Sequence, residues 1–516
     1  MNIKIDKQSK TAIYVQLAAQ LKKQILSGEL AVGSTLPSER AMAKLLSVHR
    51  NTVAKAYTEL KAEELVESQQ GIGYIVTVPA VDDRDSDKPR AAAGRHSDAA
   101  ALTEAPQRAK KPNRVHWKSV INDRYLDMQV TFDDLFQRFG EKDKISMGSG
   151  IACPGIYDTK EIAESIAAMI SKEGKTQYFY SPYKGDKALR YKLVSFLSTK
   201  GIKATTGEIQ ILSETNQALD FVVMLLVKPG DTVIMEEPVS PDAYRTMELA
   251  GAHISTIPVD SDGMDCEALE RIIIKKKPAL IFVNSSFHDP TGVILPLERR
   301  KKIVELSNTY RIPIVEEDAA SELVYEGMKL PPLKAFDKAE NVIYIYSFSL
   351  TFVPGLSLAF VVANRDLIES LSYMVSVRMM AVDWITQKLL AKYLSDGSYF
   401  GILNEFRENY AGKQKIVCAA LDEMKQYGIS YDKPRGGVYI WCRLPSGVDS
   451  KQFIDDAYKR GLSLLPGYVF YPLKNGGREH IRINYSFESE DRLVRGLEIF
   501  KETLQAATSG TLAHKK

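Results

Sequence analysis

Cysteine is scarce in this sequence, and the spacing of the few cysteines excludes two kinds of scaffold. The 516 residues include only 4 cysteines (Cys153, Cys266, Cys418 and Cys442), and no CxxC or CxH pair occurs among them. Such spacing supports neither a structural zinc site nor a disulfide framework. We therefore predict reduced thiols and no metal centre.

Long apolar runs and a large excess of one charge are also missing. The longest apolar run, Phe221 to Val227, is too short to cross a bilayer, and the amino end MNIKIDKQSK has no apolar core of a signal peptide. The 68 basic and 65 acidic side chains leave a formal charge of only +3, which excludes a protein that holds nucleic acid by bulk charge. These absences predict a cytoplasmic protein without a membrane partner, in which any DNA binding is local.

The composition that remains is that of a folded protein with several domains. Hydrophobic residues make up 45% and charged residues 26% of the chain, which excludes global disorder and a fibrous architecture. Residues 80–113, however, contain DDRDSDK, AAAG and KKPN with almost no large apolar side chains. This composition is typical of a flexible linker. The sequence thus predicts a first unit over residues 1–79, a linker over 80–113 and a second unit over 114–516.

The first unit has the periodicity of helices followed by a β-hairpin. Apolar residues recur at helical spacing from 13 to 25, and Gly28 ends this helix. A second helix is predicted to start within 36–40, with Ser38 as its cap, and a third at about Arg50. The inward side chains of the third helix would be Val53, Ala56, Tyr57 and Leu60. Residues 65–68 and 74–78 complete the hairpin, so the order predicts an α+β winged helix-turn-helix.

The third helix carries side chains suited to reading DNA. The second helix of a helix-turn-helix enters the major groove and presents its amino end to the base edges. The side chains presented here would be His49, Arg50, Asn51 and Thr52, with Lys55 one turn further along. Arginine binds guanine, and asparagine binds adenine, in bidentate fashion, so this set suits direct readout. The alternative interpretation is a solvated polar helix face.

Two further positions would contact the DNA backbone. Arg40 is expected beside a phosphate, and Gly73 lets the wing approach the backbone closely. Residues 1–79 contain 10 basic and 7 acidic side chains, a modest excess that suits a dimeric reader better than a single one.

These motifs carry a family resemblance. The segment YVQLAAQLKKQILSGELAVGSTLPSERAMAKLLSVHRNTVAKAYTEL, followed by ESQQGIGYIV, is similar to the winged-helix domain of the GntR family of bacterial repressors and activators. The resemblance covers nearly the whole first unit. It implies a double-stranded DNA operator as partner, and it supports Arg40, Arg50, Asn51, Thr52 and Gly73 as contacts.

The second unit alternates helical stretches with short β-rich runs. These runs lie at 232–235, 280–283, 312–315, 342–346 and 358–362. Strands separated by helices predict an α/β domain with a mainly parallel sheet. After about Ile416, GGVYIWCRLP and HIRINYSF are predicted to be strands of a smaller α+β lobe. We expect a large lobe over about 145–400, a small lobe over about 410–516 and a cleft between them.

This unit resembles the fold-type I aminotransferases, which use pyridoxal phosphate (PLP). The likeness rests on YSPYKG at 180–185, DPTG at 289–292, SFSL at 347–350 and GGV at 436–438. A GntR-like head joined to such a body resembles the MocR subfamily of regulators. The resemblance implies a multidomain fold, a winged helix-turn-helix followed by an aminotransferase-like domain.

The positions that would hold PLP depart from the family pattern. A PLP enzyme needs a lysine for the Schiff base and donors around the phosphate. The resemblance assigns that lysine to the position of Leu350, a phosphate-binding arginine to Ser357, and the glycine of a phosphate-binding helix N-terminus to Glu214. Further degenerate positions are Ser240, Asp289, Glu317 and Ala319, the last standing where a tyrosine would hold the cofactor's phenolic oxygen. We therefore predict no PLP cofactor, no catalytic residue and no transaminase activity.

Two positions of the family's ligand site persist. Arg482 matches the arginine that clamps a substrate carboxylate with a bidentate fork, and Tyr180 matches a residue that reaches the neighbouring subunit's site. The alternative interpretations are a structural salt bridge and a core tyrosine.

Three functions remain open at this point. The favoured one is a homodimeric, DNA-binding transcriptional regulator whose inactive body senses a small carboxylate or amino-acid-like effector. The second is a bifunctional PLP-dependent aminotransferase and regulator, with the lysine supplied from elsewhere; Lys334 and Lys338 are nearby in sequence. The third is a body that serves only as a dimerisation scaffold.

Overall fold

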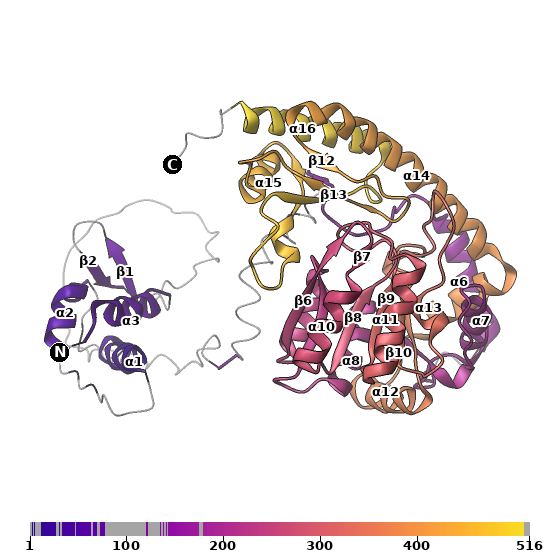
Figure 1. Cartoon of the computed structure of the whole chain (residues 1–516), viewed down its shortest axis with the longest axis horizontal. Helices are drawn as coiled ribbons and strands as arrows, with labels where there is room; N and C mark the ends of the chain where they lie inside the picture. The colour runs from indigo at the N-terminus through magenta and orange to yellow at the C-terminus, as the bar shows by residue number, and fades with distance from the viewer. Residues whose placement is uncertain are drawn as a thin grey trace, which may run out of the picture. The chain divides into compact units, whose positions relative to one another are not determined.

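The computed structural model divides the chain into two units, Met1–Pro112 and Asn113–Lys516 (Figure 1). It describes residues 3, 5, 12–26, 30, 33–46, 48–62, 65–69, 73–77, 120, 121, 135, 138, 141, 143–174 and 179–509. The predicted linker over 80–113 lies outside the described residues, as do Gly28 and the centre of the hairpin connection.

The first unit has the predicted order of helices and strands. It consists of α1 (Ile13–Leu26), α2 (Glu39–Leu46), α3 (Arg50–Ala62), β1 (Val66–Gln69) and β2 (Gly73–Val76), with the two strands antiparallel. The cap prediction is confirmed, because Ser38 Oγ accepts a hydrogen bond from the Ala41 amide at 3.2 Å. The four predicted inward side chains of α3 are buried, and they pack on Leu17, Leu21 and Met42.

The large lobe is built on an eight-stranded sheet. Its order is β4 (Ile209–Leu212), β11 (Ala359–Val362), β10 (Val342–Ser347), β9 (Ile314–Asp318), β8 (Leu280–Asn284), β5 (Thr232–Glu237), β6 (His253–Asp260) and β7 (Gly263–Met264). The five strands from β10 to β6 are parallel, whereas β11 and β7 run antiparallel to their neighbours. The predicted mainly parallel sheet is therefore confirmed.

Helices cover both faces of this sheet. They are α6 (Thr159–Glu173), α7 (Lys187–Ser198), α8 (Thr215–Leu226), α9 (Pro241–Leu249), α10 (Cys266–Lys276), α11 (Leu297–Tyr310), α12 (Arg365–Arg378) and α13 (Trp384–Asp396). Successive strand residues point to opposite faces. Val233 accordingly packs in the core with α8, while its neighbour Ile234 packs in a second core with α10 and α11. Burial of both faces explains why the strands are continuous apolar runs.

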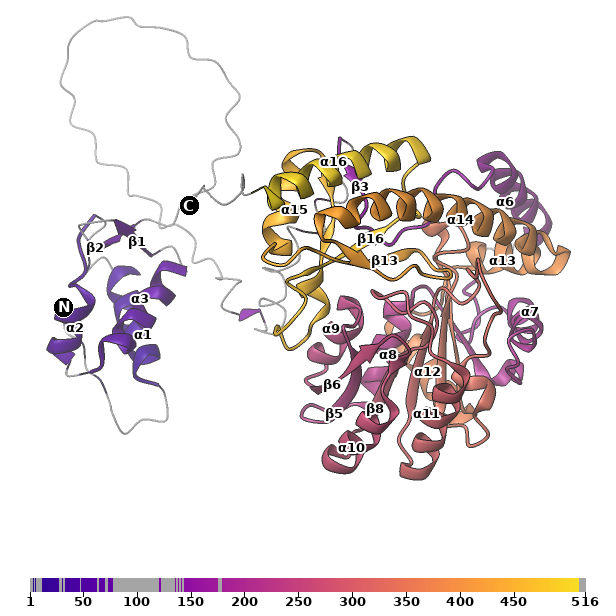
Figure 2. The ribbon, with the colours of Figure 1, turned by 45° about the horizontal axis from the view of Figure 1, so that its top comes forward.

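The small lobe contains the predicted C-terminal strands. Its antiparallel sheet has the order β12 (Ser430–Tyr431), β13 (Tyr439–Arg443), β16 (His480–Asn484) and β15 (Leu465–Pro466), and it carries α15 (Ser450–Lys459) and α16 (Glu490–Thr508). The long helix α14 (Ser398–Met424) packs against α13 of the large lobe and against α16 (Figure 2). The predicted lobe boundary near residue 410 falls inside this helix.

Residues 138, 141, 145 and 146, near the amino end of the second unit, contact the small lobe. Strand β3 (Ile145–Ser146) pairs in parallel with β14 (Leu462–Ser463). Ahead of β3, Arg138 Nη1 lies 2.8 Å from Asp455 Oδ1, and the Tyr458 hydroxyl donates a hydrogen bond to Glu141 at 2.6 Å. The sequence pattern placed residue 145 at the start of the large lobe. It belongs with the small lobe instead, because its buried side chain packs with Leu462 and Gly496.

Two other features of the described residues bear on the sequence-based expectations. All four cysteines are free thiols, as predicted. Within the described ranges, no helix combines the length and apolarity that a bilayer crossing requires.

Candidate functional site

A cavity of about 210 Å³ lies at the carboxyl edge of the large-lobe sheet. Asn284 ends β8, Glu317 lies near the end of β9, and Ser349 follows β10, so parallel strands bring these residues to one edge. Six of the seven positions predicted to be degenerate line the cavity: Glu214, Ser240, Asp289, Glu317, Ala319 and Leu350. The exception is Ser357. It follows the short helix η4 (Pro354–Leu356), and its buried Oγ has no hydrogen-bond partner among the described residues.

Leu350 places an aliphatic side chain at the wall of the cavity. It is 5% exposed and belongs to the main hydrophobic core of the domain. None of the described residues that line the cavity is lysine or arginine. Lys334, one alternative source of an amine, pairs with Asp337 at 2.9 Å, and neither it nor Lys338 is a lining residue.

The N-terminus of α8 also opens on the cavity. The first residues of a helix offer free amides and a positive dipole end, which together attract anions. Glu214 is the residue that precedes the helix, and Thr215 and Asn216 begin it; all three line the cavity. The carboxylate of Glu214 therefore places the chain's own negative charge where a phosphate would otherwise bind.

Two carboxyl groups at the cavity, the half-buried Glu317 and the buried Glu236, have raised pKa values. Burial raises the pKa of Glu317 to about 7, and the negative charges of Asp289 and Asp242 add to the rise. Burial likewise raises the pKa of Glu236 to about 8. A hydrogen bond of 2.7 Å from the main-chain N–H of Asn284 to Glu236 Oε2 opposes this rise only in part. Protonation therefore sets the charge of this edge around neutral pH.

Arg482 is engaged by a carboxylate of the chain itself. Its Nη1 lies 2.8 and 2.9 Å from the two carboxyl oxygens of Asp289, and its Nη2 donates to the Gly148 carbonyl at 2.8 Å. The guanidinium stacks over Tyr439, 4.2 Å from the ring centroid, and Arg482 is 6% exposed. The arrangement is that of a structural salt bridge, the alternative interpretation of this residue. Its predicted role in ligand binding stays a prediction.

Tyr180 lies away from the core. It is 76% exposed, and its neighbours Phe179 and Tyr183 are exposed as well, so it is not a core tyrosine. It does not line the cavity. The prediction that it reaches a neighbouring subunit remains open.

In the first unit, the predicted DNA contacts gather around the amino end of α3. His49, Arg50 and Asn51 are exposed there, and Thr52 is half-buried. Arg50 is held by Glu39 of α2, with its Nε 3.0 Å from Oε2. Lys55 is exposed and lies over the ring of Tyr14 at 4.0 Å.

The two predicted backbone contacts are also accessible. Arg40 is exposed in the first turn of α2. Gly73 has a φ of +110°, which other residues rarely adopt, and no atom of the described residues lies within 4 Å of an added Cβ. The wing can therefore approach another surface closely at this point.

Comparison with known proteins supports both halves of the sequence interpretation. Residues 142–498 match the family described as aminotransferase class I and II. The chain belongs to that family. Residues 13–76 of this aminotransferase-family member match a second family, the bacterial regulatory proteins of the gntR family. The combination confirms the resemblance to MocR-type regulators that the motifs indicated, and with it the multidomain fold.

Several relatives of this aminotransferase-family chain match over most of their length. The uncharacterized HTH-type transcriptional regulator YdfD of Bacillus subtilis is 25% identical over 95% of this chain and 96% of its own length. The probable rhizopine catabolism regulatory protein MocR of Rhizobium meliloti is 26% identical over 90% of this chain and 88% of its own. Among solved structures, the kynurenine aminotransferase of Pyrococcus horikoshii, crystallised with PMP, matches with a TM-score of 0.71 and 28% identity. That match covers 76% of this chain and 98% of the enzyme.

Among the lining residues that the sequence interpretation did not single out, Asp242, Asn284 and Tyr439 bring polar groups to the cavity of the aminotransferase-like domain. Asn284 directly follows a predicted β-rich run, so its position at a strand end was a usable signal. Asp242 and Tyr439 reach the site from α9 and β13. Tyr439 directly follows the GGV motif, which was a usable signal, whereas no quoted motif includes Asp242.

Proposed function

We propose that this chain is a sequence-specific DNA-binding transcriptional regulator whose aminotransferase-like domain dimerises and senses a small ligand without PLP catalysis. The observation that carries the proposal is Leu350, a buried aliphatic side chain at the position where the family has its Schiff-base lysine. Two relatives that span nearly the whole chain are named as regulators, which supports a role in transcription. A ligand would act by favouring one arrangement of the domain over another.

The donor set of the cavity does not fit PLP. The aldehyde of PLP needs an amine, but the described lining offers Leu350 and no lysine. The phosphate needs donors and a positive charge, but the amides at the start of α8 are accompanied by the carboxylate of Glu214 and by no described lining cation. Each charge-assisted hydrogen bond is worth about 1.5–3 kcal/mol, so the absence of several would weaken binding by orders of magnitude. This argues against the bifunctional enzyme.

Incubation with PLP followed by borohydride reduction should leave the mass of the purified protein unchanged. An imine can be trapped only where a lysine amine lies beside the bound aldehyde, and no lysine lines the described cavity. Intact-mass spectrometry and peptide mapping provide the measurement. A stoichiometric adduct on one lysine, such as Lys334 or Lys338, would instead support the bifunctional enzyme.

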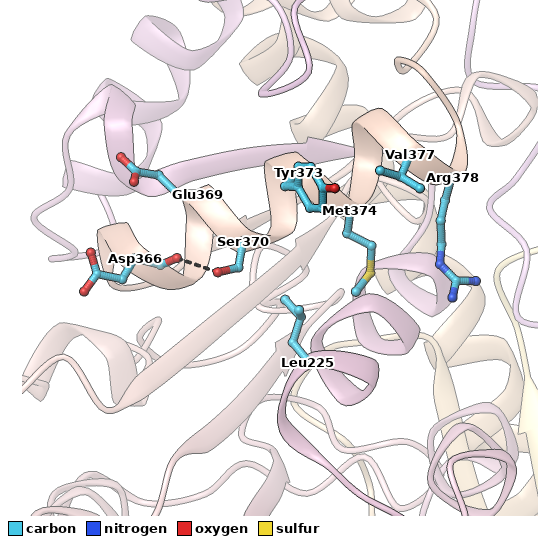
Figure 3. Close-up of a pocket in the computed structure, with 8 residues that line it drawn as sticks. All are labelled: Leu225, Asp366, Glu369, Ser370, Tyr373, Met374, Val377 and Arg378. Atoms are coloured by element: carbon cyan, nitrogen blue, oxygen red, sulfur yellow. Dashed lines mark hydrogen bonds between the residues drawn. The ribbon is translucent and has the colours of Figure 1, made fainter.

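An exposed apolar face on α12 supports the proposed homodimer. Tyr373 and Val377 stand one helical turn apart and are 73% and 67% exposed. They border a groove of about 700 Å³ that Leu225 of α8 and Met374 complete (Figure 3). Apolar patches of this kind mark interfaces. We assign it to a second copy of this chain, because a helix-turn-helix reader needs two heads to span two half-sites.

The double substitution Tyr373→Asp with Val377→Asp should convert the protein from dimer to monomer in light scattering. In a two-fold interface the same patch of each subunit is buried, so the two new carboxylates of one subunit would lie against the two of the other. Burial of these unpaired, mutually repelling charges would destabilise the dimer. The matched control is Ile274→Asp on α10, where an equally exposed apolar residue lies outside the groove. A dimer that persists in the double variant, or a monomeric parent, would contradict this assignment.

A further inference from the structure

Carboxylates dominate the charge of the cavity in the aminotransferase-like domain. Four of its lining residues are acidic, namely Glu214, Asp242, Asp289 and Glu317, and no described lining residue is basic. Arg482 neutralises Asp289 through both carboxyl oxygens. The other three acids form no ion pair with a described residue, although Arg482 and Arg245 lie close enough to act on the charge of Asp242. Acidic groups therefore outnumber the cations around this cavity.

A second observation at the cavity is a hydrogen-bond acceptor without a donor among the described residues, the side-chain oxygen of Asn284. The Oδ1 atom of Asn284 is buried and accepts no hydrogen bond from any described residue. Its Nδ2 is turned toward Glu317 at 3.4 Å, which fixes Oδ1 as the free end of the amide. Buried acceptors are normally paired, so a ligand that brings an N–H group would complete this site.

The same lining is unfavourable for anions. The arginine that would clamp a carboxylate already holds Asp289, and Glu214 stands at the helix N-terminus that would attract a phosphate. Phe287 supplies aromatic surface to the wall, and aromatic faces attract cations. Tyr439 also lines the wall, but one face of its ring already carries the guanidinium of Arg482. The acidic lining, the unpaired acceptor and the aromatic surface therefore all favour a cationic ligand that carries N–H groups.

We propose that this cavity binds a small organic cation, an aliphatic amine or guanidine that carries no carboxylate or phosphate. Glu317 and Asn284 Oδ1 accept its N–H groups, and Asp242 and Glu214 complement its charge. With about 210 Å³, the cavity is smaller than the roughly 300–1,000 Å³ of sites for drug-sized molecules, so the ligand is short. This inference rests on the proposed sensor function and names the ligand class of its site.

Three probes of equal chain length test the proposal on the full-length protein: 1,4-diaminobutane, butane-1,4-diol and succinate. Calorimetry and thermal shift should detect binding of the diamine alone. Glu317→Gln should weaken that binding roughly 10- to 100-fold, because it removes one charge-assisted contact. The control Glu267→Gln, at an acid of α10 that is 89% exposed and lines neither the cavity nor the groove on α12, should leave the binding unchanged.

A second variant tests the role of the internal clamp. Asp289→Asn should release Arg482 and allow succinate to bind, provided the melting temperature of the unliganded variant shows that it folds. Binding of succinate to the parent, diamine binding unaffected by Glu317→Gln, or no binding of any probe would each overturn the proposal. The borohydride experiment distinguishes failure of the proposed function from failure of the cation site. A PLP adduct would refute the proposed function. A protein that forms no adduct and does not bind the diamine would refute only the cation site.

Discussion

Substituting Arg482→Leu is expected to destabilise the folded protein by about 3–5 kcal/mol at neutral pH. The guanidinium is the only described cation within ion-pair distance of Asp289, and both oxygens of that carboxylate depend on it. Its removal would leave a negative charge beside Glu317 and Asp242 with no compensation. Chemical denaturation with a two-state fit to the transition of this domain would measure the loss.

The pH dependence of this loss distinguishes an uncompensated charge from poor packing. Burial already raises the pKa of Asp289, and removal of Arg482 would raise it further. If an acid has a higher pKa in the folded state than in the unfolded state, its ionisation lowers the stability of the fold at any pH above its pKa in the unfolded state. This destabilisation disappears as the pH falls and the acid is protonated in both states. The deficit should therefore shrink from pH about 8 to pH about 5. Adding Asp289→Leu should restore most of the stability, whereas a deficit that is the same at both pH values would identify a packing defect.

Replacing Arg50 by alanine should cost about 1–3 kcal/mol of operator binding per head and reduce the preference for the operator over other sequences. Arg50 is exposed at the amino end of α3, where its fork can reach a base edge. In the free protein the guanidinium of Arg50 forms an ion pair with Glu39 at 3.0 Å. This solvent-exposed ion pair must break before Arg50 can contact a base. An operator selected from a random duplex library and a scrambled duplex, compared by fluorescence anisotropy at fixed salt, provide the measurement.

Arg40→Ala is the matched control for base readout. A phosphate contact carries no sequence information, so its loss should weaken binding to both duplexes alike and reduce the slope of affinity against salt. Equal behaviour of the Arg40 and Arg50 variants would contradict the proposed placement of α3 in the major groove.

Local sequence signals were sufficient to predict the helices and strands of the first unit. The apolar spacing from 13 to 25, the cap at Ser38 and the start of a helix at Arg50 all depend on neighbours within a few residues. Five of the eight strands of the large-lobe sheet were also recognisable as apolar runs, whereas β4, β6 and β7 were not predicted. The order of the strands was not recognisable, because β11 pairs antiparallel between β10 and β4, and strand pairing depends on residues distant in sequence.

The site shows the same division between local and distant information. Leu350 and Glu214 were identified from motifs because each departs from a pattern within its own segment. Arg482 and Asp289 were each singled out, yet their contact joins residues 193 positions apart and could not be inferred from either motif. Asp242 lay in no quoted motif, and Tyr439 followed the GGV motif without a predicted role, since only the packing of α9 and β13 brings them to the cavity.

The pairing of β3 with β14 gives the small lobe a mechanical role. The strand and the two contacts ahead of it, from Arg138 to Asp455 and from Tyr458 to Glu141, fasten the incoming chain to this lobe rather than to the large sheet. These contacts attach the chain to the lobe that also supplies Tyr439 to the cavity. Any shift of the small lobe relative to the large sheet would therefore move this attachment point together with Tyr439.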